Sequence, residues 1–338
     1  MNSPGTTNIY DRRTVSVVIP HYTTPVLRQC SIATCGDIFI AMNSIFNRLA
    51  VVAPTIEADL SIFNKNLRRL ECQLKSANID FLFVVIFQSK NTGMRAHVND
   101  IYGSFCKVLH SDVLNVSHAR NLGIEYIEEL DFQGRVLFFD STISFDKSVW
   151  EVFKSPQTTF LPLWFTHVNW TSIKTTSRIK CSQEASVKMT IADVFYRAYV
   201  WSAFFSVNLL KGLRFDERFG VGPDAIYQGG EDVLFIVNAF LKNGSEACSF
   251  PCCDVYHPPR PLNFSKHLKY ARGTGAMFGC LIRSCESSRY RVLFIVFLML
   301  SVCNALLRCL LLRKYSFLIL KLRIFGFLDS INGSQVRL

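Results

Sequence analysis

The last quarter of this chain has almost no acidic residues. From residue 260 onward there are thirteen Lys and Arg side chains, and only Glu286 and Asp329 oppose them. The first 259 residues hold 24 basic and 24 acidic side chains, so the whole formal net charge of +11 lies in the last quarter. This region also lacks any nucleic-acid-binding motif and is rich in apolar residues, which argues against a nucleic-acid partner.

The chain also lacks the cysteine pattern of a zinc site or a disulfide framework. Its twelve cysteines include no CxxC pairs, and the cluster of Cys248, Cys252 and Cys253 near His257 has irregular spacing. Reduced thiols in a cytosolic compartment are the simplest interpretation. The polar residues at the start predict no signal peptide, and we find no internal repeat or low-complexity tract.

Two apolar stretches occupy the basic C-terminal region. Residues 292–307 carry no charge and are followed by Arg308. Residues 315–328 contain only two charged residues, Lys321 and Arg323. The first stretch is shorter than the ~20 residues that a membrane-spanning helix needs. We therefore expect two helices that lie in or dip into the cytoplasmic leaflet, where anionic headgroups contribute about 1 kcal/mol per basic residue. The alternative is a buried pair of helices, but the region lacks acidic partners for its cations.

Apolar runs that alternate with helical spacing predict a parallel α/β fold. Residues 49–54 predict a strand that ends in proline, and residues 81–87 are a continuous apolar run, which is typical of a strand buried on both faces. Residues 135–139, four apolar residues after Arg135, predict a further buried strand. A helix between the first two is predicted by apolar residues at helix spacing, namely Leu60, Phe63, Leu67, Leu70 and Leu74. A further helix should begin near Ser117, which could serve as its N-cap.

Polar residues follow the ends of these predicted strands. Pro54 and Thr55, then Gln88 and Ser89, and finally Asp140 stand at three carboxyl ends. Because ligands bind at the carboxyl ends of strands in parallel α/β sheets, we expect these residues to line one crevice.

An acidic pair, Glu231 and Asp232, follows a glycine-rich loop and precedes an apolar run that lasts to Gly244. This pattern predicts that the pair lies at a helix N-terminus, where the helix dipole stabilises the charged form of a carboxylate. Glycines in the loop would let a ligand approach the backbone. For an isolated pair, a simple helix cap is the ordinary explanation.

Taken together, these features resemble the family 2 glycosyltransferases of bacterial surface-polysaccharide synthesis, which are inverting enzymes with the GT-A nucleotide-sugar-binding fold. The resemblance covers about residues 49–275. Four segments carry it: a first strand at 49–55, an SxARNxG pattern at 117–123, the strand before the metal-binding DxD at 136–140, and a segment at 212–232 (GLRFDERFGVG…GED) that looks like the family's GxFDExFGxG…GED. Residues 15–20 also look like an opening strand. However, the distance from Pro54 to Ser89 matches one βαβ unit, so we place the first strand before Pro54.

The resemblance implies roles for individual residues. It implies that Asp232 is the general base and that Glu231 supports it or contacts the acceptor. Asp140 and His257 would hold Mg²⁺ or Mn²⁺. Donor-binding residues would be Pro54, Thr55, Gln88, Ser89, Arg120, Asp140 and Arg272, with Arg272 on a flexible glycine loop that could close over the diphosphate. For His257 and Arg272, an ordinary loop or turn residue is the alternative, and for Arg120 a surface helix residue.

Two positions depart from the family pattern. Thr142 stands where the second acid of the DxD is expected. Gln88 stands where the family usually has an acid that contacts the nucleobase. An amide offers both a donor and an acceptor, so Gln88 can still bond the edge of uracil or guanine. The QxxRW motif of processive synthases is absent, which favours the addition of a single sugar.

The sequence thus predicts a glycosyltransferase that moves one sugar from a nucleotide-sugar donor, most simply a UDP-sugar, to a lipid-linked saccharide. It would be peripheral or monotopic at the cytoplasmic face of the inner membrane. We expect an extension at 1–47, a GT-A domain at 48–280 whose nucleotide-binding half ends near 145, and membrane-associating helices at 281–338. The alternative is a non-catalytic GT-A module that binds nucleotide or scaffolds a membrane complex. A nucleotidyltransferase would need a glycine-rich phosphate loop after the first strand, where Pro54 and Thr55 stand instead.

Overall fold

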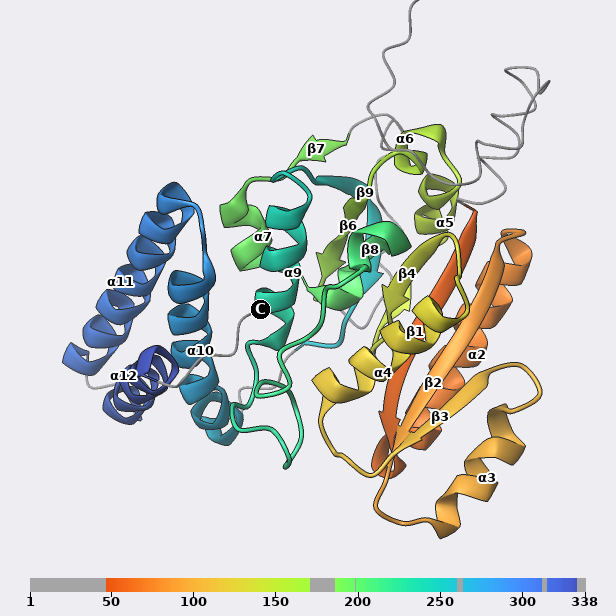
Figure 1. Ribbon diagram of the computed structural model, residues 1–338, viewed down its shortest axis with the longest axis horizontal. Coiled ribbons are helices and arrows are strands. Elements are labelled where there is room, and N and C mark those ends of the chain that lie inside the picture. Colours follow the sequence, from red (N-terminus) through yellow and green to blue (C-terminus); the bar gives the residue numbers. More distant parts are fainter. Residues whose placement is uncertain (1–46, 171–185, 198, 260–263, 312–314, 333–338) are drawn as a thin grey trace, which may run out of the picture. The chain divides into compact units, whose positions relative to one another are not determined.

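The computed structural model describes residues 47–170, 186–197, 199–259, 264–311 and 315–332. These residues belong to one compact unit, residues 43–338. The possible opening strand at residues 15–20 lies outside the described residues. At the centre of the unit is a mixed sheet with the strand order β3-β2-β1-β4-β8-β6-β9-β5, to which β7 adds by pairing with β9 (Figure 1).

The first half of the sheet is parallel, as the sequence predicted. Its strands are β1 (Arg48–Ile56), β2 (Asp80–Gln88), β3 (Lys107–Ser111) and β4 (Arg135–Phe138). The connecting helices are η2 (Glu57–Asp59), α2 (Leu60–Ser76), α3 (Gly93–Tyr102) and α4 (Val116–Glu129). Figure 1 shows α2 and α4 on opposite sides of these strands, which explains why the strands are apolar on both faces.

The second half of the sheet mixes strand directions. β8 runs antiparallel to β4 and β6, whereas β6 and β9 are parallel. Its strands are β5 (Ser144–Phe145), β6 (Leu163–Asn169), β7 (Val187–Lys188), β8 (Ala203–Ser206) and β9 (Cys248–Tyr256). Its helices are α5 (Ser148–Phe153), α6 (Pro156–Thr159), α7 (Ile191–Arg197), η3 (Val200–Ser202), α8 (Val207–Leu210) and α9 (Glu231–Lys242).

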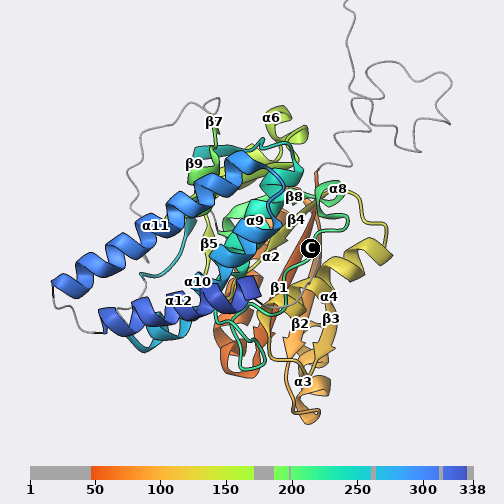
Figure 2. The same ribbon diagram turned by 60° about the vertical axis from the view of Figure 1, so that its left-hand side comes forward.

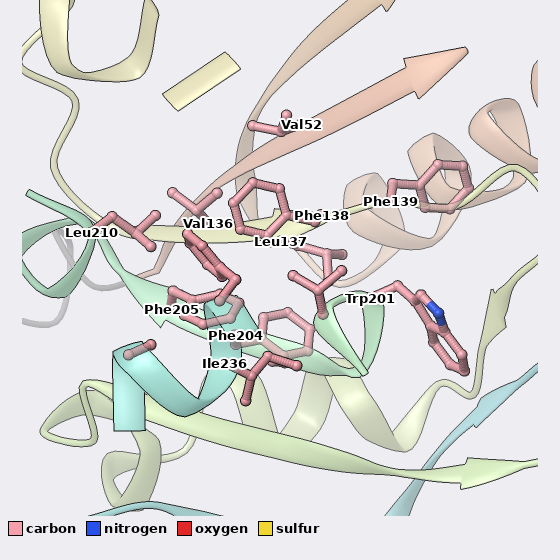
Figure 3. Packing of buried hydrophobic residues seen from close by; sticks show 14 of the residues in the cluster. Val52, Val136, Leu137, Phe138, Phe139, Trp201, Phe204, Phe205, Leu210 and Ile236 are labelled. Carbon is pink, nitrogen blue, oxygen red and sulfur yellow. The ribbon is translucent and has the colours of Figure 1, made fainter. Parts of the chain in front are cut away.

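Aromatic side chains join α9 to the middle of the sheet. Phe138 of β4 and Phe205 of β8 lie against each other (Figure 3). Phe138 packs edge to face on Phe205 and on Phe235 of α9, with 5.6 Å between ring centroids in each pair. Phe235 in turn stacks on Phe215 at 3.8 Å. Burial of such rings contributes a large share of core stability. This cluster therefore fixes the first turn of α9, where the acidic pair lies, relative to the strand ends.

Three C-terminal helices follow β9 and lie beside α9 and α7 (Figures 1 and 2). They are α10 (Phe264–Ser284), α11 (Ser288–Leu310) and α12 (Ser316–Asn332). α10 and α12 pack closely because glycines stand at their crossing: a Cβ at Gly275 would clash with the carbonyl oxygen of Arg323, and one at Gly326 with that of Arg272.

Helix α11 is longer than the sequence predicted. It starts four residues before the uncharged run and continues through Arg308, giving 23 residues with a mean hydropathy of 2.3 in its most apolar window. The expectation that this helix is too short to cross a membrane was wrong, because we took Arg308 as its end. By length and composition α11 can cross a membrane, and only 17% of its apolar window is buried in the protein.

Candidate active site

The acidic pair opens helix α9, as predicted. Gly229 and Gly230 precede it with φ of 76° and 100°, a left-handed conformation that favours glycine. Gly230 is the N-cap of the helix, so Glu231 and Asp232 occupy its first turn. The positive end of the helix dipole stabilises negative charge at this place.

Asp232 is held by an arginine from the other motif. The Arg120 Nη1 donates to Asp232 Oδ1 at 2.7 Å, and the Arg120 side chain is only 6% exposed. The guanidinium also lies over the Phe215 ring, 5.1 Å from its centroid. Arg120 is therefore a buried partner of the predicted base, and its expected contact with the donor stays a prediction.

Glu231 is more deeply buried than its neighbour. Within the described chain, its Oε2 atom is shielded from solvent and has no hydrogen-bond partner. Burial raises the pKa of Glu231, the charge of Asp232 raises it further, and the Arg120 guanidinium opposes both. The pair thus combines a carboxyl group that tends to stay protonated with a carboxylate bound to arginine.

The two motifs from the sequence meet through Asn121. Its amide Nδ2 donates to the Phe215 carbonyl at 3.0 Å and to Glu217 Oε1 at 2.8 Å, and its Oδ1 accepts from the Phe215 N–H at 2.8 Å. The prediction that Ser117 caps this helix was wrong. Helix α4 begins at Val116, so Asn115 is its N-cap, and the Asn115 side chain accepts a hydrogen bond from the Ser117 N–H. Asn121 was part of the SxARNxG pattern, but we gave it no role, because its partners are 94 and 96 residues away.

The strand ends converge as predicted. Pairing of β1 with β2 sets Pro54 beside Ile86 and Ile56 beside Gln88. β4 lies on the other side of β1, and the chain passes directly from it to Asp140. Thr55, Gln88 and Ser89 are all buried, at 3%, 5% and 7% exposure. The predicted crevice residues therefore share one edge of the sheet.

Asp140 and His257 come together on either side of Thr142. The Thr142 hydroxyl donates to Asp140 Oδ1 at 2.7 Å and lies 3.2 Å from His257 Nε2. The other ring nitrogen, Nδ1, is 2.7 Å from the Pro258 carbonyl, which can only accept, so Nδ1 carries the proton. When the ring is neutral, Nε2 can only accept a hydrogen bond. The single hydroxyl proton of Thr142 then faces two acceptors, Asp140 Oδ1 and His257 Nε2.

These residues fit a divalent cation with two protein ligands. Carboxylate oxygen suits both Mg²⁺ and Mn²⁺, whereas imidazole nitrogen suits Mn²⁺ better than Mg²⁺, and both side chains reach the same Thr142 hydroxyl. Across the described ranges, no group of three or more His, Cys, Asp or Glu side chains could hold a metal. Further ligands would have to come from a bound substrate.

Two tryptophans surround His257. Trp201 stacks on its ring at 5.2 Å between centroids, and Trp170 lies 5.0 Å away. We assigned neither ring a role from the sequence. Their packing fixes the orientation of the imidazole next to Thr142.

Arg272 is not on a flexible loop. It lies inside α10, and its Nη2 is 2.6 Å from Asp329 Oδ2 of α12. The expectation was wrong because we took Gly273 and Gly275 as loop residues. They are contact points instead: a Cβ at Gly273 would clash with the carbonyl oxygens of Gln228 and Gly229.

Two solved glycosyltransferase structures are similar to this fold. The crystal structure of S. aureus TarS 1–349 in complex with UDP-GlcNAc matches with a TM-score of 0.56 and 14% identity, over 84% of this chain and 81% of that chain. The mannosyltransferase PcManGT from Pyrobaculum calidifontis, in complex with GDP-Man and Mn²⁺, matches with a TM-score of 0.51 and 13% identity, over 85% and 88%. The chain has the GT-A glycosyltransferase fold. In the UDP complex of TarS 1–349, the match covers 68% of this chain and 65% of that chain, at 17% identity and a TM-score of 0.47.

No family model and no curated protein matches the chain. The GT-A fold is therefore established by structure alone. It accounts for the parallel half of the sheet and for the common edge at which the predicted site residues of β1, β2 and β4 lie.

Proposed function

We propose that the chain is an inverting glycosyltransferase that moves one sugar from a nucleotide-sugar donor, most simply a UDP-sugar, to a lipid-linked saccharide. The pathway would be bacterial surface-polysaccharide synthesis. One observation carries the proposal: the carboxylate of Asp232 lies at the N-terminus of α9 and is held by Arg120 from the SxARNxG helix. The proposed domains are the extension at 1–47, the GT-A domain at 48–280 and the membrane-associating helices at 281–338.

Asp232 would act as the general base. The acceptor oxygen attacks the anomeric carbon, its proton passes to Asp232, and the bond from that carbon to the diphosphate oxygen breaks on the opposite side. Arg120 occupies Oδ1, whereas Oδ2 accepts no hydrogen bond from the described residues. The free oxygen supplies the lone pair for the proton. Glu231, whose pKa is raised, would bind an acceptor hydroxyl as a neutral donor.

The donor would bind along the strand ends. Gln88 offers an amide to the nucleobase, and Asp140 with His257 would hold the divalent cation. When bound, that cation would neutralise charge on the departing diphosphate. The TarS and PcManGT structures were solved with UDP-GlcNAc and with GDP-Man and Mn²⁺, which supports this class of donor.

The C-terminal helices support a lipid-linked acceptor at the cytoplasmic face of the inner membrane. Large apolar side chains of α11 and α12 are exposed, including Met299, Leu300, Leu310 and Phe317 at 55%, 57%, 79% and 74%. Within the described residues of α11 and α12 there are five basic side chains and one acid, Asp329, which pairs with Arg272 of α10. Such a surface favours an anionic leaflet and would keep the active site close to a lipid-bound sugar.

The substitution Asp232→Asn tests the base. Because Asn cannot accept the proton, we expect transfer to fall by about 10²- to 10⁴-fold while UDP binding stays within about twofold. Glu129→Gln is the control, since Glu129 is an exposed carboxylate on α4, the helix that carries Arg120. A donor screen that measures released nucleoside diphosphate, with membrane lipid as acceptor, provides the readout. Full activity of the Asn variant would contradict the assignment.

A non-catalytic GT-A module is the second candidate, because Thr142 stands where the DxD acid is expected and leaves two protein ligands for a metal. Calorimetric titration with UDP and GDP, with and without Mn²⁺, separates the two. An enzyme should bind the nucleotide more tightly with Mn²⁺. Metal-independent binding without turnover of any donor would favour the module.

A further inference from the structure

A cavity of about 170 Å³ lies between helices α10, α11 and α12. Its lining is apolar apart from Ser301 of α11 and Arg323 of α12. One water occupies about 30 Å³ of liquid volume, so the space holds a group much larger than a water molecule. The glycine contacts at Gly275 and Gly326 fix the distance between α10 and α12 next to this space.

Arg323 is part of the cavity lining, and its guanidinium is incompletely hydrogen-bonded. Its Nη1 donates to Ser301 Oγ at 3.0 Å, but its Nε is shielded from solvent and has no partner among the described residues. Arg323 forms no ion pair with any of the described residues, because Asp329, the acid on the same helix, is bound to Arg272. Because Arg323 is partly withdrawn from water and has no ionic partner among the described residues, its site favours an anion.

The surroundings strengthen the demand for negative charge. Burial lowers the pKa of Arg323, and the positive charge of Arg308 lowers it further. An anion that pairs with Arg323 would therefore also reduce the repulsion between the two arginines.

The rest of the cavity is suited to hydrocarbon. Met299 and Ile324, both in its lining, are 55% and 42% exposed, so the cavity borders on the apolar outer surface of α11 and α12. A free inorganic anion would leave this apolar rim in water. An anion with an attached acyl chain would cover it, at about 0.8 kcal/mol per buried CH₂ group.

We propose that Arg323 and Ser301 bind the phosphate of an anionic phospholipid, whose acyl chain lies along Met299 and Ile324. The inference rests on the proposed membrane association and adds a specific lipid site to it. The site differs from the crevice of the candidate active site, since it is built only by the C-terminal helices.

The test compares Arg323→Gln with Lys321→Gln in the full chain. Each variant removes one positive charge from α12, but Lys321 is exposed and Arg323 lines the cavity. Binding to phosphatidylcholine vesicles that contain phosphatidylglycerol is measured at low salt and at about 0.5 M salt, where exposed charges are strongly screened. We expect Arg323→Gln to lose about tenfold in affinity at both salt concentrations, because the charge of Arg323 is partly buried and hydrogen-bonded to Ser301. Lys321→Gln should differ from the parent only at low salt.

A cavity-filling variant tests whether the cavity itself is needed for binding, separately from the loss of a positive charge. Val302→Phe keeps both cations and occupies part of the space, so it should also lose the salt-resistant binding. Thermal unfolding of each variant in detergent shows whether it is folded. Equal losses for Arg323→Gln and Lys321→Gln at high salt would overturn the lipid site.

Two further measurements identify the ligand and separate this inference from the proposed function. If inorganic phosphate raises the melting temperature as much as phosphatidylglycerol does, and Arg323→Gln abolishes both effects, the site is a phosphate site and the lipid assignment is wrong. UDP binding is measured on the same variants and should not change. Absence of glycosyl transfer with normal lipid binding would reject the proposed function and leave the lipid site standing.

Discussion

The contact between the two motifs can be tested by Asn121→Asp, which replaces the amide nitrogen of Asn121 with oxygen at almost the same volume. The variant keeps an acceptor for the Phe215 N–H but loses both donations from Nδ2. One of them goes to the carbonyl of Phe215, a residue that is 3% exposed, and the other goes to Glu217. The substitution therefore leaves a buried carbonyl unpaired and sets two carboxyl groups against each other.

The magnitude follows from these two losses. An unpaired buried acceptor costs about 1–3 kcal/mol. The new carboxylate would lie at the 2.8 Å distance that now separates Asn121 Nδ2 from Glu217 Oε1, where like charges cannot both remain ionised without a cost of a few kcal/mol. We expect the free energy of unfolding at pH 7 to fall by about 3–5 kcal/mol.

The pH dependence identifies the cause. Repulsion raises the folded-state pKa of the introduced carboxyl above its unfolded value of about 3.9. The electrostatic cost is thus absent below the unfolded pKa and grows as pH rises through the folded pKa. Denaturant unfolding at pH 4 and pH 7 should show a smaller loss at pH 4.

Two companion variants complete this experiment. The double variant Asn121→Asp/Glu217→Gln reverses the donor and the acceptor, and we expect it to recover at least about 1 kcal/mol in a double-mutant cycle. Gln133→Glu is the control, because Gln133 donates to Asp131 Oδ1 at 2.9 Å at an exposed site, where the same change should cost less than about 1 kcal/mol. A loss at Asn121 no larger than this, or one independent of pH, would refute the reasoning.

Two further predictions concern the acids and the metal ligands. Burial raises the pKa of Glu231 above its unfolded value of about 4.3, so ionisation of Glu231 lowers the stability of the parent as pH rises through the folded pKa. The variant Glu231→Gln has no such ionisation, and we expect its stability relative to the parent to increase between pH 4 and pH 8. A difference in melting temperature that stays constant over this pH range would contradict the prediction. Thr142→Asp adds a third ligand between Asp140 and His257, so calorimetry should show tighter Mn²⁺ binding with UDP than in the parent, whereas Thr142→Val should weaken it or leave it unchanged. Equal Mn²⁺ affinity for all three proteins would exclude a metal at this position.

The elements that could be predicted are those with a strong local pattern. Continuous apolar runs predicted β1, β2 and β4, and leucines at helix spacing predicted α2. The start of α9 followed from two glycines and an acidic pair. In each case the local sequence contains both the hydrophobic period and the chain-breaking residues, so no distant partner is needed to recognise it.

The errors concern residues whose role depends on distant partners. Glycine marks a turn in most sequences, but Gly273 and Gly275 lie within a helix, where they allow two different neighbours to approach its backbone. Arg308 ended the predicted apolar run, yet a long side chain at one exposed position does not stop a helix. Neither the loop at residues 228–229 nor α12 can be inferred as a neighbour of α10 from the residues around Gly273.

These same glycines connect the two parts of the proposed mechanism. On one side of α10, Gly273 contacts the backbone of Gln228 and Gly229, directly before the acidic pair. Further along the helix, Gly275 contacts Arg323, the residue to which we assign a lipid phosphate. Because close-packed backbones leave no room to slide independently, the position of α12 constrains α10 and, through it, the loop at residues 228–230 that leads into the first turn of α9, where Asp232 lies. The C-terminal helices would therefore support the catalytic loop as well as hold the protein at the membrane.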